Sequence, residues 1–340
     1  MLVNQLFKRV FAVGFATALS ACASLGPNYL AAGRPLYNEA VQETDAQQLL
    51  LNIVRQRYND PVLFLDVTSI TSKATYSVGG NVRAAIPFSG TTSLTPELGP
   101  RIEDSPLIFY TPNNGEKFVR QVLTPLDIRT LTLVLQAGWS IERVLLLTGE
   151  SLAGQRNTSG EYRVLVSALR DLQRSGDVMI GVDAAGSTPA VVFTFSPASR
   201  ETAAYKTVCQ AFRAACAGES IQIRHGFGGP AASGAPASLA TRSLYSALYF
   251  LADAVDVPPG DVSAARGRSP GGPDDELFRV RTSATEPPAA SVKVRYRNAW
   301  FYIADTDGDA KVTFALLSML LTLQAGDTAK VTPLITLPAS

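Results

Sequence analysis

The chain has 340 residues, of which 46% are hydrophobic and 17% are charged, and its formal net charge is +1 at pH 7. This composition supplies enough apolar material for a packed core and excludes a disordered chain. The near-neutral charge argues against nucleic acid as a partner bound by the whole surface.

The first 21 residues have the pattern of a secretory signal. Lys8 and Arg9 make a positively charged start, and residues 10–19 are an uninterrupted run of apolar or small residues. This order is typical of an exported protein. The run has about ten residues, whereas a helix that spans a bilayer needs roughly 20. We therefore expect residues 1–21 to be a signal peptide that is removed.

The leader ends at Leu19-Ser20-Ala21-Cys22, which resembles the lipobox of bacterial lipoproteins. The resemblance implies cleavage before Cys22, acylation of its thiol with fatty acids such as palmitate, and acylation of the new amino terminus. The alternative is a soluble secreted protein with Cys at this place. Family members that stay in the inner membrane often have Asp after the lipid-bearing Cys, and Ala23 stands here. The resemblance therefore implies the outer membrane.

The lipid bilayer is thus an expected partner, reached through acylated Cys22. Two or more acyl chains anchor a protein stably, because each buried methylene contributes about 0.8 kcal/mol. Residues 22–36 are small, polar and interrupted by Gly and Pro, a composition typical of a short tether. We expect this tether to hold a globular body, residues 37–340, close to the membrane in the periplasm.

The body begins with a predicted helix at Thr44, where Thr44-Asp45-Ala46-Gln47 has the form of a capping box. Apolar residues recur at helical spacing up to Tyr58, and Asn59-Asp60-Pro61 predicts the end of the helix. Strands are then expected at residues 62–70, 74–78 and 82–86, with a turn at Gly79-Gly80-Asn81. Residues 89–104 are rich in Gly, Pro, Ser and Thr and predict a loop before the apolar run 107–110.

Helical patterns dominate the middle of the chain. Apolar stripes predict helices at residues 115–123, 126–137, 141–147, 158–174, 244–255 and 312–324, the fourth with a capping box from Thr158 to Glu161. Strands are expected at residues 178–182, 191–195, 222–224, 277–281, 292–296, 300–303 and 331–337. The stretches 226–240 and 258–274 predict loops. These elements predict an α+β fold with a mostly antiparallel sheet, in one compact unit or two closely packed halves.

Two cysteines remain besides Cys22, namely Cys209 and Cys216. On one continuous helix they would stand about 10.5 Å apart along the axis, beyond the roughly 7 Å that limits bridged Cα atoms. Either the stretch bends and the cysteines form a disulfide, or it is helical and both thiols are free. An oxidising periplasm favours the disulfide. A metal site is not expected here, because the chain has one His.

Three further stretches together resemble a group of uncharacterised lipoproteins and exported proteins of Gram-negative bacteria. They are Leu51-Asn52-Ile53-Val54-Arg55-x-Arg57-Tyr58, Tyr110-Thr111-Pro112 with Gly115-Glu116-Lys117-Phe118, and Trp300-Phe301-Tyr302-Ile303. The resemblance covers most of the mature chain and favours one continuous unit. It implies no activity.

Two motifs are similar to parts of a serine hydrolase. Gly149-Glu150-Ser151-Leu152-Ala153 is similar to the G-x-S-x-G nucleophile elbow, and His225-Gly226-x-Gly228-Gly229 to an oxyanion loop. The oxyanion loop should precede the nucleophile, and His225 cannot also serve as the general base. We therefore expect no enzyme and no cofactor. The alternative for these residues is a turn that ends a helix and a flexible loop.

The stretch Asp305-x-Asp307-x-Asp309 is similar to the start of a calcium loop. An EF-hand has Gly and Glu where Ala310 and Leu316 stand in this chain. We favour a polar turn whose carboxylates cap the following helix, and expect no metal.

Basic and apolar residues alternate in two of the predicted strands. Alternate residues of a strand lie on the same face, so Arg279, Arg281, Lys293, Arg295 and Arg297 would share a face if the two strands pair. That face could bind lipid phosphates, an anionic glycan or an acidic protein surface. The alternative is a solvated face neutralised by neighbouring Asp and Glu.

The sequence favours a non-enzymatic role at the cell envelope. We expect a lipoprotein of the outer membrane that acts as a subunit or accessory of an envelope protein complex, for example beside a channel or export machine. The alternative is a periplasmic module that binds a glycan or small ligand, with Trp139, Trp300, Tyr302 and Tyr296 as candidate stacking surfaces.

Overall fold

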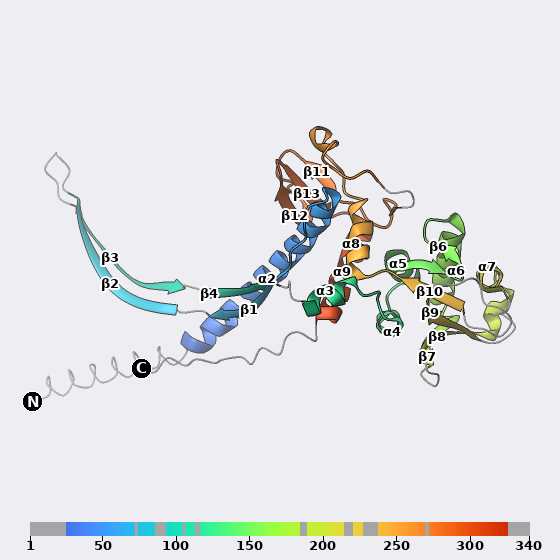
Figure 1. Ribbon diagram of the computed structural model, residues 1–340. Helices are drawn as coiled ribbons and strands as arrows, with labels where there is room; N and C mark the ends of the chain where they lie inside the picture. Colours follow the sequence, from blue (N-terminus) through green and yellow to red (C-terminus); the bar gives the residue numbers. More distant parts are fainter. Residues whose placement is uncertain are drawn as a thin grey trace, which may run out of the picture. The chain divides into compact units, whose positions relative to one another are not determined.

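The computed structural model describes residues 25–71, 74–85, 93–104, 107–112, 116–183, 189–213, 220–226, 237–268 and 272–325 (Figure 1). Internal contacts divide the chain into two units. The larger unit comprises Met1–Val62 and Gln121–Gln324, and the ribbon unit comprises Leu63–Arg120 with Ala325–Ser340. Helices and mostly antiparallel sheets make up the described chain, so the predicted α+β fold is confirmed.

The long helix α2 (Leu25–Arg57) begins well before the predicted start. Thr44 lies inside α2, where its hydroxyl donates to the carbonyl oxygens of Ala40 and Val41, so the predicted cap at Thr44 is wrong. The predicted tether is helical from Leu25 onward as well. Packing fixes the C-terminal end of α2, and extending a helix is far easier than nucleating one. The small residues of the predicted tether gave no indication that it continues the helix.

The other described helices lie close to their predicted places, except α7 (Ala203–Phe212), because the sequence left the stretch around Cys209 open between a helix and a bend closed by a disulfide. They are α3 (Glu116–Leu123), α4 (Ile128–Gln136), α5 (Ile141–Thr148), α6 (Gly160–Arg174), α7, α8 (Leu244–Ala252) and α9 (Gly308–Ala325), with short 3-10 turns η1 (Pro197–Glu201) and η3 (Pro259–Asp261). Ser159, and not Thr158, caps α6, because its hydroxyl accepts from the backbone N–H of Tyr162 at 3.2 Å. The predicted capping box was therefore misplaced by a single residue.

A six-stranded sheet in the larger unit has the order β6-β5-β10-β9-β8-β7. Its strands are β5 (Gly149–Leu152), β6 (Gln155–Arg156), β7 (Val178–Asp183), β8 (Ala190–Phe195), β9 (Ser220–His225) and β10 (Ala237–Thr241). Neighbours are antiparallel except β9 and β10, which are parallel. β10 lies in a stretch predicted to be a loop. Pairing partners on both sides outweigh the weak strand preference of its Ala and Ser residues.

Apolar side chains from α4, α5 and this sheet form a core. Those that line one small internal cavity and are almost fully buried include Leu131, Val144, Leu152, Phe193 and Leu239. Helix α7 is joined to the sheet by an edge-on contact between the rings of Phe195 and Tyr205, whose centres are 5.3 Å apart. The core therefore lies between the sheet and its covering helices.

A three-stranded antiparallel sheet packs against α2. Its strands are β11 (Arg281–Ser283), β12 (Ala290–Tyr296) and β13 (Ala299–Ala304), in the order β11-β13-β12 (Figure 1). Helix α2 contacts β12 and α8, and the ring of Tyr58 meets Phe301 edge-on at 6.2 Å. Phe301 and Ile303 are fully buried, so the face they share is the inner one.

The ribbon unit contains two nested strand pairs, β1 (Leu65–Thr71) with β4 (Leu107–Pro112) and β2 (Ala74–Ala85) with β3 (Ser93–Asp104). Both pairs are antiparallel and share one register. Thr71 is opposite Leu107, Ala74 is opposite Asp104, and Ala85 is opposite Ser93. Each sheet of this unit has two strands.

The ribbon overturns two predictions. Strand β2 runs through Gly79-Gly80-Asn81, which was predicted to be a turn, and β3 occupies most of the predicted loop 89–104. Gly79 lies opposite Gly99, so cross-strand pairing holds residues that have little strand preference of their own. Pro96 and Pro100 are tolerated because β3 is an edge strand, where an N–H is not needed at every residue.

Candidate functional site

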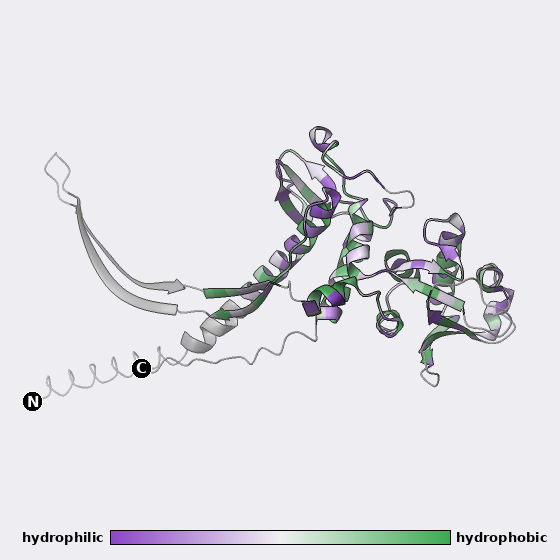
Figure 2. Cartoon of the chain, viewed as in Figure 1, coloured by the Kyte–Doolittle hydropathy of each residue, from purple (hydrophilic) through white to green (hydrophobic). Residues whose placement is uncertain are grey.

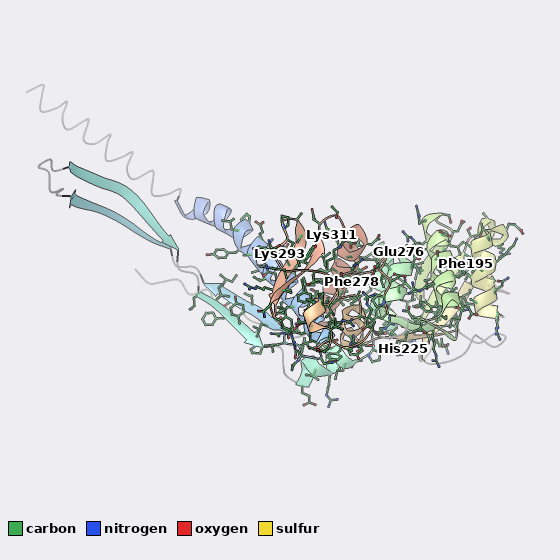
Figure 3. The ribbon with its side chains drawn as sticks, turned by 90° about the horizontal axis from the view of Figure 1, so that it is seen from above. Phe195, His225, Glu276, Phe278, Lys293 and Lys311 are labelled. Carbon is green, nitrogen blue, oxygen red and sulfur yellow. The ribbon has the colours of Figure 1, made fainter. Side chains whose placement is uncertain are left out.

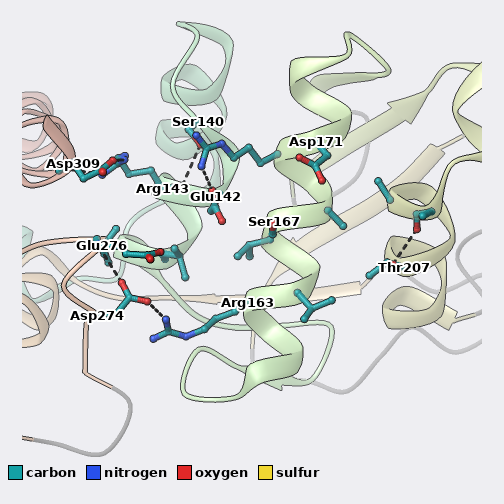
Figure 4. A pocket seen from close by; sticks show the side chains of 18 residues that line it. Ser140, Glu142, Arg143, Arg163, Ser167, Asp171, Thr207, Asp274, Glu276 and Asp309 are labelled. Carbon is teal, nitrogen blue, oxygen red and sulfur yellow. Dashed lines mark hydrogen bonds and ion pairs between the residues drawn. The ribbon is translucent and has the colours of Figure 1, made fainter.

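A groove of about 880 Å³ lies between α5, α6 and α7 in the larger unit (Figure 4). The polar residues that line it are Ser140, Glu142, Arg143, Arg163, Ser167, Arg170, Asp171, Thr207, Asp274, Glu276 and Asp309. Ser140 caps α5, because its hydroxyl accepts from the backbone N–H of Arg143. The groove is therefore lined by a mixture of polar, charged and apolar side chains from these helices and from neighbouring segments.

Each arginine of the groove is paired with a carboxylate from another segment or helix. Arg143 lies 2.5 Å from Asp309, Arg163 pairs with Asp274, and a carboxylate of α5 neutralises Arg170 at 2.5 Å. Figure 4 shows the Arg163 and Asp274 side chains pointing toward one another. The cations thus join α5, α6 and α9 to their neighbours, and we assign these three arginines a structural role.

Ser151 and His225 lie on different strands of the six-stranded sheet. Ser151 in β5 is opposite Ala240 of β10, and His225 in β9 pairs with Leu239 on the other side of β10. The Nε2 atom of His225 is 3.0 Å from the Thr241 hydroxyl. Ser151 stands in a strand and not on a sharp turn between a strand and a helix, so the geometry of a nucleophile elbow is not formed here.

The three aspartates around the start of α9 bind three different partners. Asp305 forms an ion pair with Lys311 at 2.6 Å, and Asp309 binds the arginine described above. Asp307 accepts from the backbone N–H of Ala310 at 3.0 Å and so caps α9, as the favoured interpretation predicts. Within the described residues, no cluster of His, Cys, Asp and Glu could hold a metal ion.

Charged and phenolic groups meet where α2 ends beside β12. The Tyr296 hydroxyl donates to Asp60, and Arg297 lies 3.4 Å from the same carboxylate, with its guanidinium 4.4 Å from the centre of the Tyr58 ring. The hydrogen bond from Tyr296 is the main cause that holds the pKa of Asp60 below its usual range. Burial, and then the Asp261 carboxylate, raise the pKa of Tyr58 to about 12. These contacts tie α2 to the sheet.

One buried carboxylate serves two arginines nearby. An oxygen of Asp253 is 2.8 Å from Arg266 and 3.6 Å from Arg57. Burial lowers the pKa of Arg57, and the charge of Asp253 opposes that effect. Sequence reasoning missed this cluster, because no local pattern links a residue of α2 to residues so far along the chain.

Helix α7 contains Cys209 and ends at Phe212. Arg213 then has φ 49°, so the chain leaves the helix before Cys216. A continuous helix over both cysteines is therefore excluded, and the geometric obstacle to bridging them is removed. Cys216 lies outside the described residues, and the disulfide stays a prediction.

The five predicted basic residues do not share one face. β13 lies between β11 and β12, so the two basic strands do not pair with each other, which corrects the prediction. Arg279 lies before β11 and pairs with Asp256 at 3.2 Å and Asp275 at 3.0 Å. Arg297 stands in the turn after β12 and pairs with Asp60, as described above. The remaining three basic residues, Arg281, Lys293 and Arg295, lie on β11 and β12.

A run of exposed apolar residues lies on β4 of the ribbon unit. The exposed fractions of Leu107, Ile108, Phe109 and Tyr110 are 58%, 40%, 48% and 57%, and we call these residues the apolar strand. Figure 2 shows the apolar colour along β4. These residues belong to a sheet of two strands, and such a pair is marginal in water by itself. The apolar strand is therefore a candidate contact surface, which its sequence alone did not indicate because buried strands have the same pattern.

Comparisons of the chain with protein-family models, with curated proteins and with solved structures found no match. Among the described residues, none of the helices combines the length and the apolar character that crossing a bilayer requires. The predicted lipidation residue Cys22 lies outside the described residues.

Proposed function

We propose that this protein is a non-enzymatic subunit of a cell-envelope assembly, anchored in the outer membrane by lipid on Cys22 and bound to a protein neighbour through the apolar strand. The exposure of Leu107–Tyr110 carries the proposal. Fully burying a side chain such as Phe contributes about 1.5–3 kcal/mol, so covering this strand would stabilise a complex considerably.

The partner contacts the ribbon by adding a strand or by covering its face. The edges of a sheet are templates on which strands of other chains can pair. Pro96 and Pro100 remove backbone donors from β3. If the partner adds a strand to the β2-β3 pair, we therefore expect it to pair with β2, which has more backbone donors than β3.

The length of helix α2 affects how far from the bilayer the folded part can lie. A helix of 33 residues is about 50 Å long. With lipid on Cys22, the packed end of α2 near Tyr58 can stand well away from the bilayer, instead of close to it as the composition of residues 22–36 suggests. The helix would act as a spacer that brings the folded part to its neighbours.

The anchor is tested by metabolic labelling with palmitate in a Gram-negative host. We expect label in the wild-type protein and none in Cys22→Ser, which should also leave the membrane fraction. Label in Cys22→Ser, or an unlabelled wild-type protein, would contradict the anchor.

The contact surface is tested by placing a photo-crosslinking amino acid at Phe109, with Met179 as the matched control because it is exposed to 69% in the larger unit. We expect one discrete adduct from position 109 and none from position 179. Ile108→Asn together with Tyr110→Ser should lower the yield at position 109 at least about fivefold, because burial of both side chains is lost. It should also shift the detergent-solubilised particle to a smaller mass.

The outcome that opposes the proposal is equally defined. Equal adducts from both positions, or an adduct and a particle mass that the double substitution leaves unchanged, would mean that the apolar strand is not the contact. Circular dichroism of the double variant would show whether the larger unit remains folded.

A further inference from the structure

The outer face of the three-stranded sheet carries aromatic rings between basic side chains. In β13, Tyr302 is opposite Arg281 of β11 on one side and Lys293 of β12 on the other. Trp300 is likewise flanked by Ser283 and Arg295. Directly opposed residues project from the same face of a sheet. Two rows therefore lie side by side, one with Tyr302 between two cations and one with Trp300 between a serine and an arginine. We call these six residues the aromatic-basic face.

The burial pattern shows that this face is turned to solvent. The alternate residues Val292, Val294, Phe301 and Ile303 are all buried and belong to the side of the sheet that packs on α2. In contrast, Arg281 and Arg295 are exposed, and the two rings are partly exposed. The rings are therefore accessible while their strand is held by a core beneath it.

The cations of this face differ from the neighbouring arginines in their pairing. Lys293, labelled in Figure 3, forms an ion pair with Glu286 at 2.7 Å. Within the described part of the chain, Arg281 and Arg295 form no ion pair, whereas Arg279 and Arg297 are bound to aspartates. Two uncompensated guanidinium groups thus flank the rings on opposite sides of β13.

We propose that the aromatic-basic face binds an acidic polysaccharide. Trp300 and Tyr302 are two residues apart in one strand, which places their rings about 7 Å apart, where they can stack on sugar units of the same chain. The guanidinium groups of Arg281 and Arg295 match the planar geometry of carboxylates and also bind phosphates. The face thus combines stacking surfaces with groups that recognise acidic substituents.

Nucleic acid offers stacking rings and negative charge as well, but the rest of the molecule does not favour it. Proteins that bind single strands use an extended, positively charged groove, and this chain has a formal net charge of +1. Two free arginines suffice for acidic substituents on a sugar chain.

Of the candidate stacking residues, Tyr296 binds Asp60 and Trp139 lies before α5, so neither belongs to the face.

The proposal is tested with the full-length protein in detergent, using immobilised polygalacturonate, neutral dextran and an oligothymidylate as probes. We expect binding to polygalacturonate, weakening with salt, and none to dextran. Arg281→Gln with Arg295→Gln should weaken this binding about tenfold or more, because hydrogen bonds to charged groups are the strong ones. The matched control, Arg129→Gln with Arg174→Gln, removes two exposed positive charges elsewhere and should have little effect.

The role of the rings is tested at Tyr302. Tyr302→Phe keeps a stacking surface and should retain most of the binding, whereas Tyr302→Ser should lose it. Equal losses in the Arg281/Arg295 and Arg129/Arg174 variants, or no binding to polygalacturonate, would overturn the proposal. Tighter binding to the oligothymidylate than to polygalacturonate would overturn it in favour of nucleic acid. Because the apolar strand lies in the other unit, its variants should bind polygalacturonate normally.

Discussion

Two phenylalanines, one in each unit, differ in their burial. Phe301 has no exposed surface, whereas 48% of Phe109 is exposed. Phe301 lies in a sheet that has α2 against one face, while Phe109 lies in a sheet of two strands. The same type of side chain is therefore buried where a helix covers the sheet and half exposed in the two-stranded sheet.

This difference shows where stability and where contacts reside. Stability comes from layers that exclude water from each other's apolar faces, and the larger unit has such layers around both of its sheets. Two strands alone are marginal in water. We infer that the ribbon unit gains its full stability from what it contacts, and the following predictions test that contrast.

The largest effect is expected from removing a buried ring. Phe301→Ala should lower the free energy of unfolding by about 3–5 kcal/mol, because it loses buried surface and leaves a cavity. Phe109→Ala should change it by less than about 0.5 kcal/mol, as is usual for exposed positions. Urea denaturation followed by circular dichroism measures both. Similar losses in the two variants would contradict the contrast between the units.

A smaller but clear loss is expected at the buried charge cluster. Asp253→Asn should cost about 3 kcal/mol, because two largely buried arginines lose their shared negative charge. Asp275→Asn is the control, since Asp275 is 56% exposed in its pair with Arg279, and exposed pairs contribute about 0–1 kcal/mol. Chemical denaturation compares the two. A loss at Asp275 as large as that at Asp253 would show that burial is not the cause.

The smallest effect concerns pH. The pKa of Tyr58 is raised to about 12 in the folded protein, so its contribution to stability is complete below the pKa of the unfolded chain, near 10. It is then lost as the pH rises toward 12. Tyr58→Phe should therefore flatten the decline of the melting temperature over this interval, and Tyr245→Phe should not. A decline that is unchanged in Tyr58→Phe would exclude this residue as its source.

The helices were predictable because their signals are local. In α6, Leu165, Leu169 and Leu172 recur at helical spacing and are buried together. The strands β2 and β3 were not predictable, because Gly79, Gly99 and two prolines favour turns until a partner strand is present. The start of α2 was missed for a related reason, since its residues extend a helix that is fixed at its other end.

The candidate surfaces were predictable in part. Alternation correctly placed Lys293 and Arg295 apart from the buried Val292 and Val294 of their strand. It could not show that Arg279 and Arg297 are neutralised, because their partners Asp256 and Asp60 lie far away in the sequence. The exposure of the apolar strand was hidden as well, since a run of apolar residues does not reveal whether anything covers it.

By itself, the sequence determined the α+β class and the positions of most helices, because periodic apolar residues specify which side of an element must avoid water. Only the tertiary structure decided that a stretch with two glycines pairs with a stretch that contains Gly and Pro, and that β13 separates the two basic strands. Those outcomes depend on which distant segments pair, and pairing between distant segments produces no periodic pattern of residues in the sequence.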